Sequence, residues 1–134
     1  MLKLGFDGKT AVVTGAARGI GQAIAAGLHE RGANLVLVDV LPEVAETAES
    51  LGDRAVGHVL DVTDPAAVKD FVKSVVADHG SLDVLVNNAG ITRDQLLPRM
   101  KPEEFDAVLK VNLYGTFHLT QAAARPMMKA RGGR

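Results

Sequence analysis

The 134-residue sequence predicts a single α/β domain with a parallel sheet that helices cover on both faces. Short runs of β-branched and aliphatic residues recur along the chain, and segments with apolar residues at helical spacing separate them. Glycine or proline marks most of the junctions. Strands and helices that alternate in this way form β-α-β units with right-handed crossovers. No internal repeat or linker divides the chain, so we expect one layered domain.

The first strand, helix and second strand are predicted from residues 10 to 39. TAVVTG (10–15) is a β-branched run ended by glycine, which predicts a buried strand. The next helix is predicted to end at Gly32 and to bury one apolar face, made of Ile20, Ala23, Ile24, Gly27 and Leu28. NLVLVD (34–39) is a continuous apolar run ending in an acid, typical of a parallel strand covered on both faces.

Residues 42 to 80 predict two more helices around a third strand. Pro42 suits the first position of a helix that runs to about Leu51. RAVGHVLD (54–61) is the third strand. Asp64 and Pro65 read as the N-cap and first turn of a helix that ends near Gly80. Its apolar stripe has helical spacing and consists of Val68, Phe71, Val72, Val75 and Val76.

The last part of the chain predicts a strand, an irregular stretch and a long helix. LDVLVNNAG (82–90) is a fourth strand that runs into a glycine turn. Residues 91–101 are predicted to be irregular, and the helix extends from about Glu103 to Lys129. We expect Pro126 to kink its last turn and Gly132 to end it.

Composition narrows the class of protein. A hydrophobic fraction of 47% and a charged fraction of 23% are ordinary for a globular domain, and a net charge of −1 gives no reason to expect nucleic acid as a partner. Without cysteine, disulfides and thiolate metal sites are impossible, and we expect no metal site. No apolar run approaches the ~18 residues of a membrane span, and Asp7 and Gly8 interrupt any signal-peptide core. We therefore expect a cytoplasmic protein that does not engage membranes.

The most informative segment is TGAARGIG (14–21), where a strand ends and a helix begins. Its glycines, at positions 15, 19 and 21, permit a tight turn and let backbone N–H groups approach a diphosphate. A tight strand–helix connection without a ligand is the alternative. Asp39 favours the ligand, because it lies 18 residues after Gly21, close to the ~20 expected for a carboxylate that binds a ribose. Enzymes that use S-adenosylmethionine share this pattern, so spacing alone leaves the cofactor open.

Four linked motifs resemble the short-chain dehydrogenase/reductase family along the whole chain. They are TGAARGIG (14–21), LDVT (60–63), NNAG (87–90) and VNLYGTF (111–117), in that family's order and spacing. The stretch NNAGITRDQLLPRM (87–100) is closest to the branch that reduces 3-oxoacyl groups on acyl-carrier protein. The resemblance implies a Rossmann-type doubly wound sheet of order 3-2-1-4, and hydride transfer between a nicotinamide and a small carbonyl or alcohol substrate.

The resemblance also implies a cofactor site. The matching positions are Gly15, Arg18, Gly19, Ile20 and Gly21 around the diphosphate, Asp39 at the adenosine ribose, Asp61 and Val62 beside the adenine, and Asn88, Ala89 and Gly90 under the nicotinamide and its ribose. Asp39 would repel a 2′-phosphate and so favours NAD over NADP, although Arg18 could assist a phosphate. Asn87 is interpreted as a structural residue that ties neighbouring strands together.

Asn112 is the one residue that matches the family's catalytic set. It lies in the middle of the predicted long helix, where a side-chain amide competes with helical hydrogen bonds; the alternative is an asparagine that faces solvent. In the family, the backbone carbonyl of this asparagine holds a water of the proton relay. Tyr114 is followed four residues on by His118 rather than lysine, so we interpret this tyrosine as a packing residue. The serines of the sequence do not match the family's catalytic serine; they are Ser50, Ser74 and Ser81.

These observations leave two hypotheses. The first is that the chain is the N-terminal, cofactor-binding part of a reductase that forms dimers or tetramers, with strand 4 left as an unpaired sheet edge in the chain alone. The second is a dinucleotide-binding module without catalysis. An S-adenosylmethionine transferase is disfavoured by NNAG and Asn112.

Overall fold

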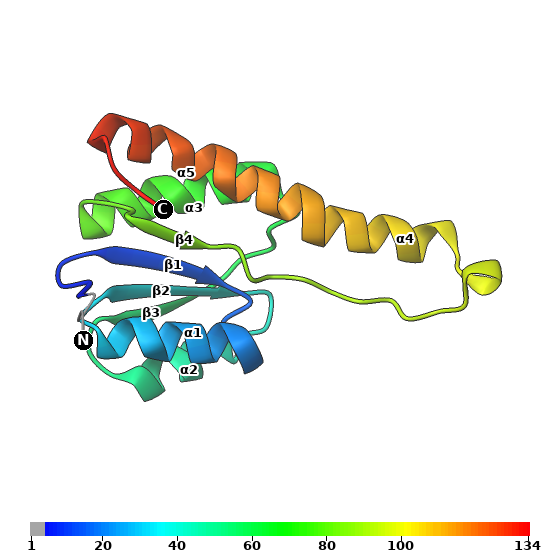
Figure 1. The fold of residues 1–134 in the computed structure, drawn as a ribbon, viewed down its shortest axis with the longest axis horizontal. Coiled ribbons are helices and arrows are strands. Elements are labelled where there is room, and N and C mark those ends of the chain that lie inside the picture. The colour runs from blue at the N-terminus through cyan, green and yellow to red at the C-terminus, as the bar shows by residue number, and fades with distance from the viewer. Residues whose placement is uncertain (1–4) are drawn as a thin grey trace.

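The core of the molecule is a four-stranded parallel sheet of order β3-β2-β1-β4 (Figure 1). The computed structural model describes residues 5–134, so residues 1–4 of the N-terminal stretch lie outside it. The strands are β1 (Thr10–Thr14), β2 (Asn34–Asp39), β3 (Ala55–Val59) and β4 (Val84–Val86). The predicted strand order is confirmed, although β3 and β4 are shorter than the sequence suggests.

Helices cover both faces of this sheet, which confirms the doubly wound architecture. Helices α1 (Gly19–Glu30) and α2 (Val44–Leu51) lie on one face, and α3 (Pro65–His79) and α5 (Thr116–Ala130) on the other (Figure 1). Successive side chains of β1 point to opposite faces, so Val12 joins the core under α3 and α5, while Val13 joins the core under α1 and α2. The continuous apolar runs of β1 and β2 are therefore buried on both sides, as predicted.

Helix α1 buries only part of the face that the apolar spacing predicts. Ile24 and Leu28 pack against the core as predicted, but Ile20 is 74% exposed, and the buried positions are Gly21 and Ala25. A Cβ on Gly21 would lie only 2.2 Å from the Gly15 carbonyl oxygen. The helix thus approaches the preceding turn through its smallest side chains, because a larger one would hold the two segments apart.

Helix α3 follows its sequence signals closely. The Asp64 carboxylate accepts hydrogen bonds from the Ala66 and Ala67 amides, both at 3.1 Å, and Pro65 occupies the first turn. Gly80 ends the helix in the left-handed conformation. Helix α2 begins at Val44, two residues later than the proline pattern predicts, because Pro42 and Glu43 form a turn.

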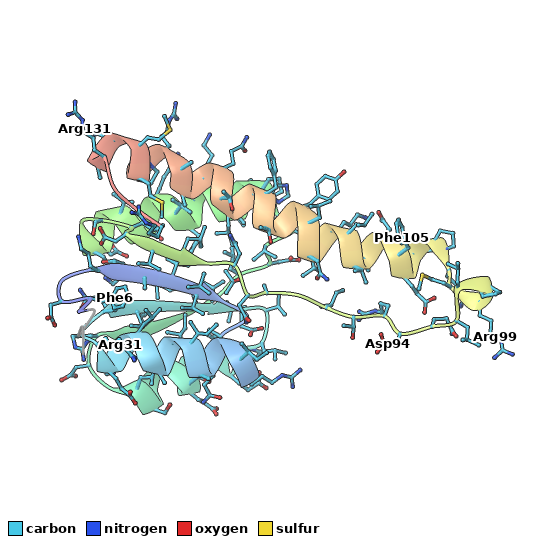
Figure 2. All side chains as sticks on the ribbon, viewed as in Figure 1. Phe6, Arg31, Asp94, Arg99, Phe105 and Arg131 are labelled. Carbon is cyan, nitrogen blue, oxygen red and sulfur yellow. The ribbon has the colours of Figure 1, made fainter. Side chains whose placement is uncertain are left out.

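The long helix consists of three consecutive segments and projects beyond the sheet. These are α4 (Pro102–Leu109), the π-helical segment η2 (Lys110–Gly115) and α5. We call residues 91–109 the arm; they comprise the irregular chain with the short 3-10 turn η1 (Leu97–Arg99), followed by α4. The arm extends past the carboxyl ends of the strands, as the positions of Asp94, Arg99 and Phe105 show (Figure 2). In α4, which is described throughout, every side chain is at least partly exposed.

Two expectations about the end of the chain need correction. Arg131, rather than Gly132, adopts the left-handed conformation that ends α5, with its amide bonded to the Met128 carbonyl. The outer edge of β4 is also partly paired. Arg134 donates its amide to the Asp83 carbonyl and accepts from the Leu85 amide, both at 2.9 Å. Among residues 5–134, the structure has no helix long and apolar enough to cross a membrane.

Candidate functional site

A cleft of about 410 Å³ opens at the carboxyl ends of the strands, where the chain leaves β1, β2, β3 and β4. In open parallel sheets this edge is the usual place for a ligand. Every predicted cofactor-binding residue except Ile20 and Gly21 lines the cleft. The sequence argument did not single out the other lining residues, which are Val38, Val40, Leu41, Leu60, Ile91 and Val111.

The glycine turn and the NNAG turn are fastened to each other by Thr14 and Asn88. The Thr14 hydroxyl accepts hydrogen bonds from the Asn88 amide at 3.0 Å and the Ala89 amide at 2.9 Å. In return, Asn88 Nδ2 donates to the carbonyl oxygens of Thr14 at 3.1 Å and Gly15 at 3.2 Å. Sequence reasoning missed Thr14, which is 1% exposed; a hydroxyl at the end of a buried strand was the available signal.

Two of the glycines are required by close contacts around these turns. A Cβ on Gly15 would approach Asn88 Nδ2 to 2.9 Å, and the φ of Gly15 is +63°. A Cβ on Gly21 would lie 2.6 Å from the same nitrogen. Gly21 therefore acts through packing beneath the turn, which explains why it does not line the cleft.

The N-terminus of α1 faces the cleft with its backbone donors uncapped. Arg18 occupies the N-cap position without a side-chain hydrogen bond, and the first turn has no acidic residue. The first amides of a helix have no partner within the helix, and the helix dipole gives this end a partial positive charge. Arg18 and Gly19 both line the cleft, so this end of the helix can receive an anion.

A carboxylate stands at the end of β2. Asp39 Oδ2 accepts from the Ala17 amide at 3.0 Å, and its Oδ1 accepts from the Leu41 amide at 3.1 Å. Thr47 steadies the same turn by donating to the Ala17 carbonyl at 2.7 Å. The ion pairs of residues 5–134 are Lys9–Asp83 and Lys110–Asp106, so Arg18 forms no ion pair with Asp39. The cleft thus has a fixed negative group at one side and a cationic turn at another.

The segment after β3 is held by its own turn and by the long helix. Asp61 Oδ1 accepts from both the amide and the hydroxyl of Thr63, at 2.9 and 2.7 Å. The Val62 carbonyl accepts from His118 Nδ1 at 3.1 Å. A Cβ on Gly115 would lie 2.5 Å from Val62 Cγ2, so η2 passes directly against this segment.

Asn112 lies in η2 and binds the arm through its side chain. Its Oδ1 accepts from the Ile91 amide at 2.8 Å, and its Nδ2 donates to the Ile91 carbonyl at 3.0 Å. The Asn112 carbonyl accepts from the Thr116 hydroxyl at 3.1 Å. The amide side chain therefore competes for backbone groups outside the helix, and π-helical turns are frequent at functional sites. Ile91 and Val111 line the cleft, whereas Asn112 does not.

The other polar residues considered from the sequence lie away from the cleft. Asn87 Nδ2 donates to the Thr120 hydroxyl at 3.1 Å and so joins β4 to α5. Tyr114 is 54% exposed and its ring lies tilted near that of His118, so it is not a packing residue of the core within this chain. The serines bond locally, namely Ser50 to Thr47, Ser74 to Phe71 and Ser81 to Asp83.

Comparisons with known proteins identify the family of the chain. A family model described as short chain dehydrogenase matches residues 9–134. The 3-oxoacyl-[acyl-carrier-protein] reductases FabG of Escherichia coli (strain K12) and of Vibrio cholerae are each 46% identical to the chain over 132 residues, which cover 98% of the chain and 54% of the relative. The FabG of Thermotoga maritima is 45% identical over 132 residues, covering 96% and 54%. The chain therefore spans about half the length of the curated relatives that it matches, and it belongs to the short-chain dehydrogenase family.

Proposed function

We propose that residues 1–134 form the cofactor-binding half of a nicotinamide-dependent oxidoreductase. The observation that carries this proposal is the uncapped N-terminus of α1, held open over a cleft by two glycines that tolerate no side chain. A dinucleotide diphosphate supplies the anion that these backbone donors lack. An S-adenosylmethionine enzyme has no diphosphate to place there, which makes it the weaker candidate.

The residues of the cleft fit the parts of a dinucleotide in order. The diphosphate would lie on the turn from Gly15 to Gly21, and the adenosine ribose would bond the carboxylate of Asp39. Asp61 and Val62 would border the adenine. The turn formed by Asn88, Ala89 and Gly90 would support the nicotinamide and its ribose. Ile20, which is exposed beside the turn, would contact the bound cofactor.

We further propose that the cofactor is NAD rather than NADP. Both carboxylate oxygens of Asp39 are fixed by backbone amides, so the group cannot easily turn away from a 2′-phosphate. Two negative groups in contact repel each other. Arg18, which forms no ion pair with Asp39, would favour a 2′-phosphate. We give Asp39 the larger weight because it lies where the adenosine ribose would bind.

The bound nicotinamide would supply or accept the hydride in the reaction. The residues of this chain would position it and would order the groups around it. Asn112 fixes the backbone at Ile91, on the cleft wall, while its own carbonyl is the group that would hold a relay water. That carbonyl already accepts from Thr116, and a carbonyl oxygen has a second lone pair for a water.

For the whole protein, we propose reduction of a 3-oxoacyl thioester carried on acyl-carrier protein. The support is the identity of 45 to 46% to relatives whose names state that activity. We also propose a cytoplasmic homodimer or homotetramer. Large apolar side chains are exposed along the long helix, and a second subunit would cover them; they include Phe105, Leu113, Tyr114 and Phe117.

A dinucleotide-binding module without catalysis is the second candidate. The observation that favours it is that, among residues 5–134, no Ser, Thr or Tyr lines the cleft, so the described residues place no hydroxyl there for proton transfer. Incubating the chain with NADH and a short 3-oxoacyl thioester separates binding from turnover. Binding without oxidation of NADH is the result expected for these 134 residues under either candidate, and turnover would contradict the assignment as a cofactor-binding half.

The cofactor proposal is tested by titrating the chain with NADH and NADPH and following the fluorescence of the reduced nicotinamide. We expect saturable binding of one NADH per chain and at least ~10-fold weaker binding of NADPH, since one unfavourable charge contact costs on the order of 1 kcal/mol or more. Asp39→Ala should narrow this difference, because it should lower the affinity for NADH and raise the affinity for NADPH. Equal affinities in the unmodified chain would contradict the preference, and absence of both would contradict the cofactor site.

A further inference from the structure

We propose that a second groove, between α3 and α5, binds a small anionic amphiphile with an apolar tail and a carboxylate or phosphate head. The groove has a volume of about 750 Å³. In the described part of the chain, it shares no lining residue with the cleft at the ends of the strands. Its size lies within the range of sites for small molecules, which is about 300–1,000 Å³.

The walls of the groove carry an uncompensated positive charge. Lys69 and Lys73 are one helical turn apart on α3, and Arg125 and Lys129 are one turn apart on α5. No Asp or Glu lines the groove, and the ion pairs found among residues 5–134 involve none of these four cations. The whole chain has a net charge of −1, so this concentration of cations is a local feature rather than a consequence of a basic protein.

Cations that line one groove from two helices repel each other unless an anion lies between them. The repulsion is weak while water fills the groove, but it grows when an apolar ligand excludes that water. An anionic head bound between cations of α3 and α5 would replace this repulsion by attraction. The charge pattern thus selects an anion and disfavours a cation of the same shape.

The floor of the groove is apolar. Val72 is buried, and Val76, Ala122 and Pro126 are partly exposed between the cationic rims. Each methylene of a tail that is buried on this floor would strengthen binding, so an alkyl chain would add considerably to the binding of the head. A purely polar anion would leave the floor exposed to water. An amphiphile satisfies both the rim and the floor.

The composition of the groove argues against nucleic acid as the occupant. Sites for single-stranded nucleic acid combine positive charge with aromatic side chains that stack on the bases. No Phe, Tyr or Trp lines the groove among the described residues, and His118 at one end is already bonded to the Val62 carbonyl. A compact ligand with one anionic head therefore fits the groove better than a polyanion does.

The test is a calorimetric titration of the chain with dodecyl phosphate below its micellar concentration. We expect saturable binding of one molecule per chain. Dodecyltrimethylammonium has the same tail with a positive head, and butyl phosphate has the same head with little tail; both should bind at least ~10-fold more weakly, because each lacks one of the two contacts. Equal binding of the cationic and anionic probes, or no binding of dodecyl phosphate, would overturn the proposal.

Two double variants locate the binding. Lys73→Glu with Arg125→Glu reverses two charges of the groove and should lower the affinity for dodecyl phosphate by roughly tenfold. The matched control is Arg93→Glu with Arg99→Glu, which makes the same change of charge on the exposed arm and should leave the affinity within about twofold. Circular dichroism checks that both variants fold, and NADH binding should be unchanged in both. If the groove variant fails to fold, the comparison of head groups on the unmodified chain still decides.

Equal affinity in the two variants would overturn the groove as the site. A change in oligomeric mass confined to the groove variant would also overturn it, because a second copy of the chain would then be the occupant.

Discussion

The N-termini of α1 and α3 lie at the same edge of the sheet, but a side chain caps only the N-terminus of α3. At α3, the Asp64 carboxylate accepts two backbone amides, and Pro65 removes a donor altogether. At α1, the N-cap is Arg18, no side chain caps the helix, and no acid lies in the first turn. The first arrangement completes the helix from within the chain. The second leaves donors for an external anion, and the cleft opens at that helix.

The comparison shows where this fold gives up local stability for binding. A capping side chain contributes about 0.5–2 kcal/mol, so leaving α1 uncapped has a measurable cost. The cost is offset by the packing of Gly21 and by the bonds between Thr14 and Asn88, which keep the turn in place without a ligand. The predictions below act on these supports in order of expected effect.

The largest effect is expected for Gly21→Val. Its side chain would need the space of the Gly15 carbonyl, so the turn over the cleft must move. We expect NADH binding to fall by about 100-fold or more and the free energy of unfolding to fall by at least ~2 kcal/mol. Fluorescence titration and urea unfolding measure the two quantities. Gly27→Ala is the control in the same helix, because its nearest contact would be an ordinary 3.6 Å; it should keep binding and gain up to about 1 kcal/mol.

Thr14→Val should have the second largest effect. The substitution keeps the shape but removes the acceptor of the Ala89 amide, whereas the Asn88 amide keeps its bond to the Val86 carbonyl at 3.1 Å. An unsatisfied donor in a partly buried place costs about 1–3 kcal/mol, so we expect a loss of that size in the free energy of unfolding. Thr63→Val is the matched control, because the Thr63 hydroxyl bonds only Asp61 at an exposed turn. A loss of the same size in both variants would show that Thr14 has no special role in fastening the turns.

A smaller, pH-dependent effect is expected at Asp83, at the opposite edge of the sheet. Burial raises the pKa of Asp83, but the hydrogen bonds from the Thr10 amide and the Ser81 hydroxyl, together with Lys9, outweigh it and leave the pKa below its ordinary value of 3.8. The ionised group therefore stabilises the fold above that value, and this contribution is lost as the pH falls through the lowered pKa.

Asp83→Asn tests this sign. The variant should be less stable than the unmodified chain at pH 7, and the difference should shrink below about pH 4, as unfolding in urea at several pH values would show. Asp78→Asn, at an exposed position of α3, is the control and should change neither the stability at pH 7 nor its dependence on pH. A difference that stays constant down to pH 2 would contradict the role of the charge.

Much of the fold could be predicted because its signals are local. Gly80, the Asp64–Pro65 pair and the apolar runs of β1 and β2 act within a few residues, and the structure confirms them. Apolar spacing identified Ile24 and Leu28 in α1 but not the burial of Gly21, because contact with the Gly15 turn selects the smallest side chain there rather than the most apolar one.

The features that the sequence did not predict depend on residues that are distant along the chain. The π-helical turn arises where Asn112 reaches Ile91, 21 residues away, and the Thr14 hydroxyl meets amides 74 and 75 residues on. The cationic groove needs α3 and α5 to lie side by side before Lys73 and Arg125 can face a common space. The spacing of residues within one helix does not predict contacts between residues that are distant along the chain.

The most direct test adds a capping side chain at the N-terminus of α1 and removes the one at the N-terminus of α3. Arg18→Asp places an acidic cap at α1, and Asp64→Ala removes the one at α3. For Arg18→Asp we expect NADH binding to weaken by at least ~10-fold while the free energy of unfolding holds or rises by up to about 1 kcal/mol. For Asp64→Ala we expect about 1 kcal/mol less stability and unchanged binding. If both variants bind NADH as the unmodified chain does, the N-terminus of α1 does not hold the diphosphate.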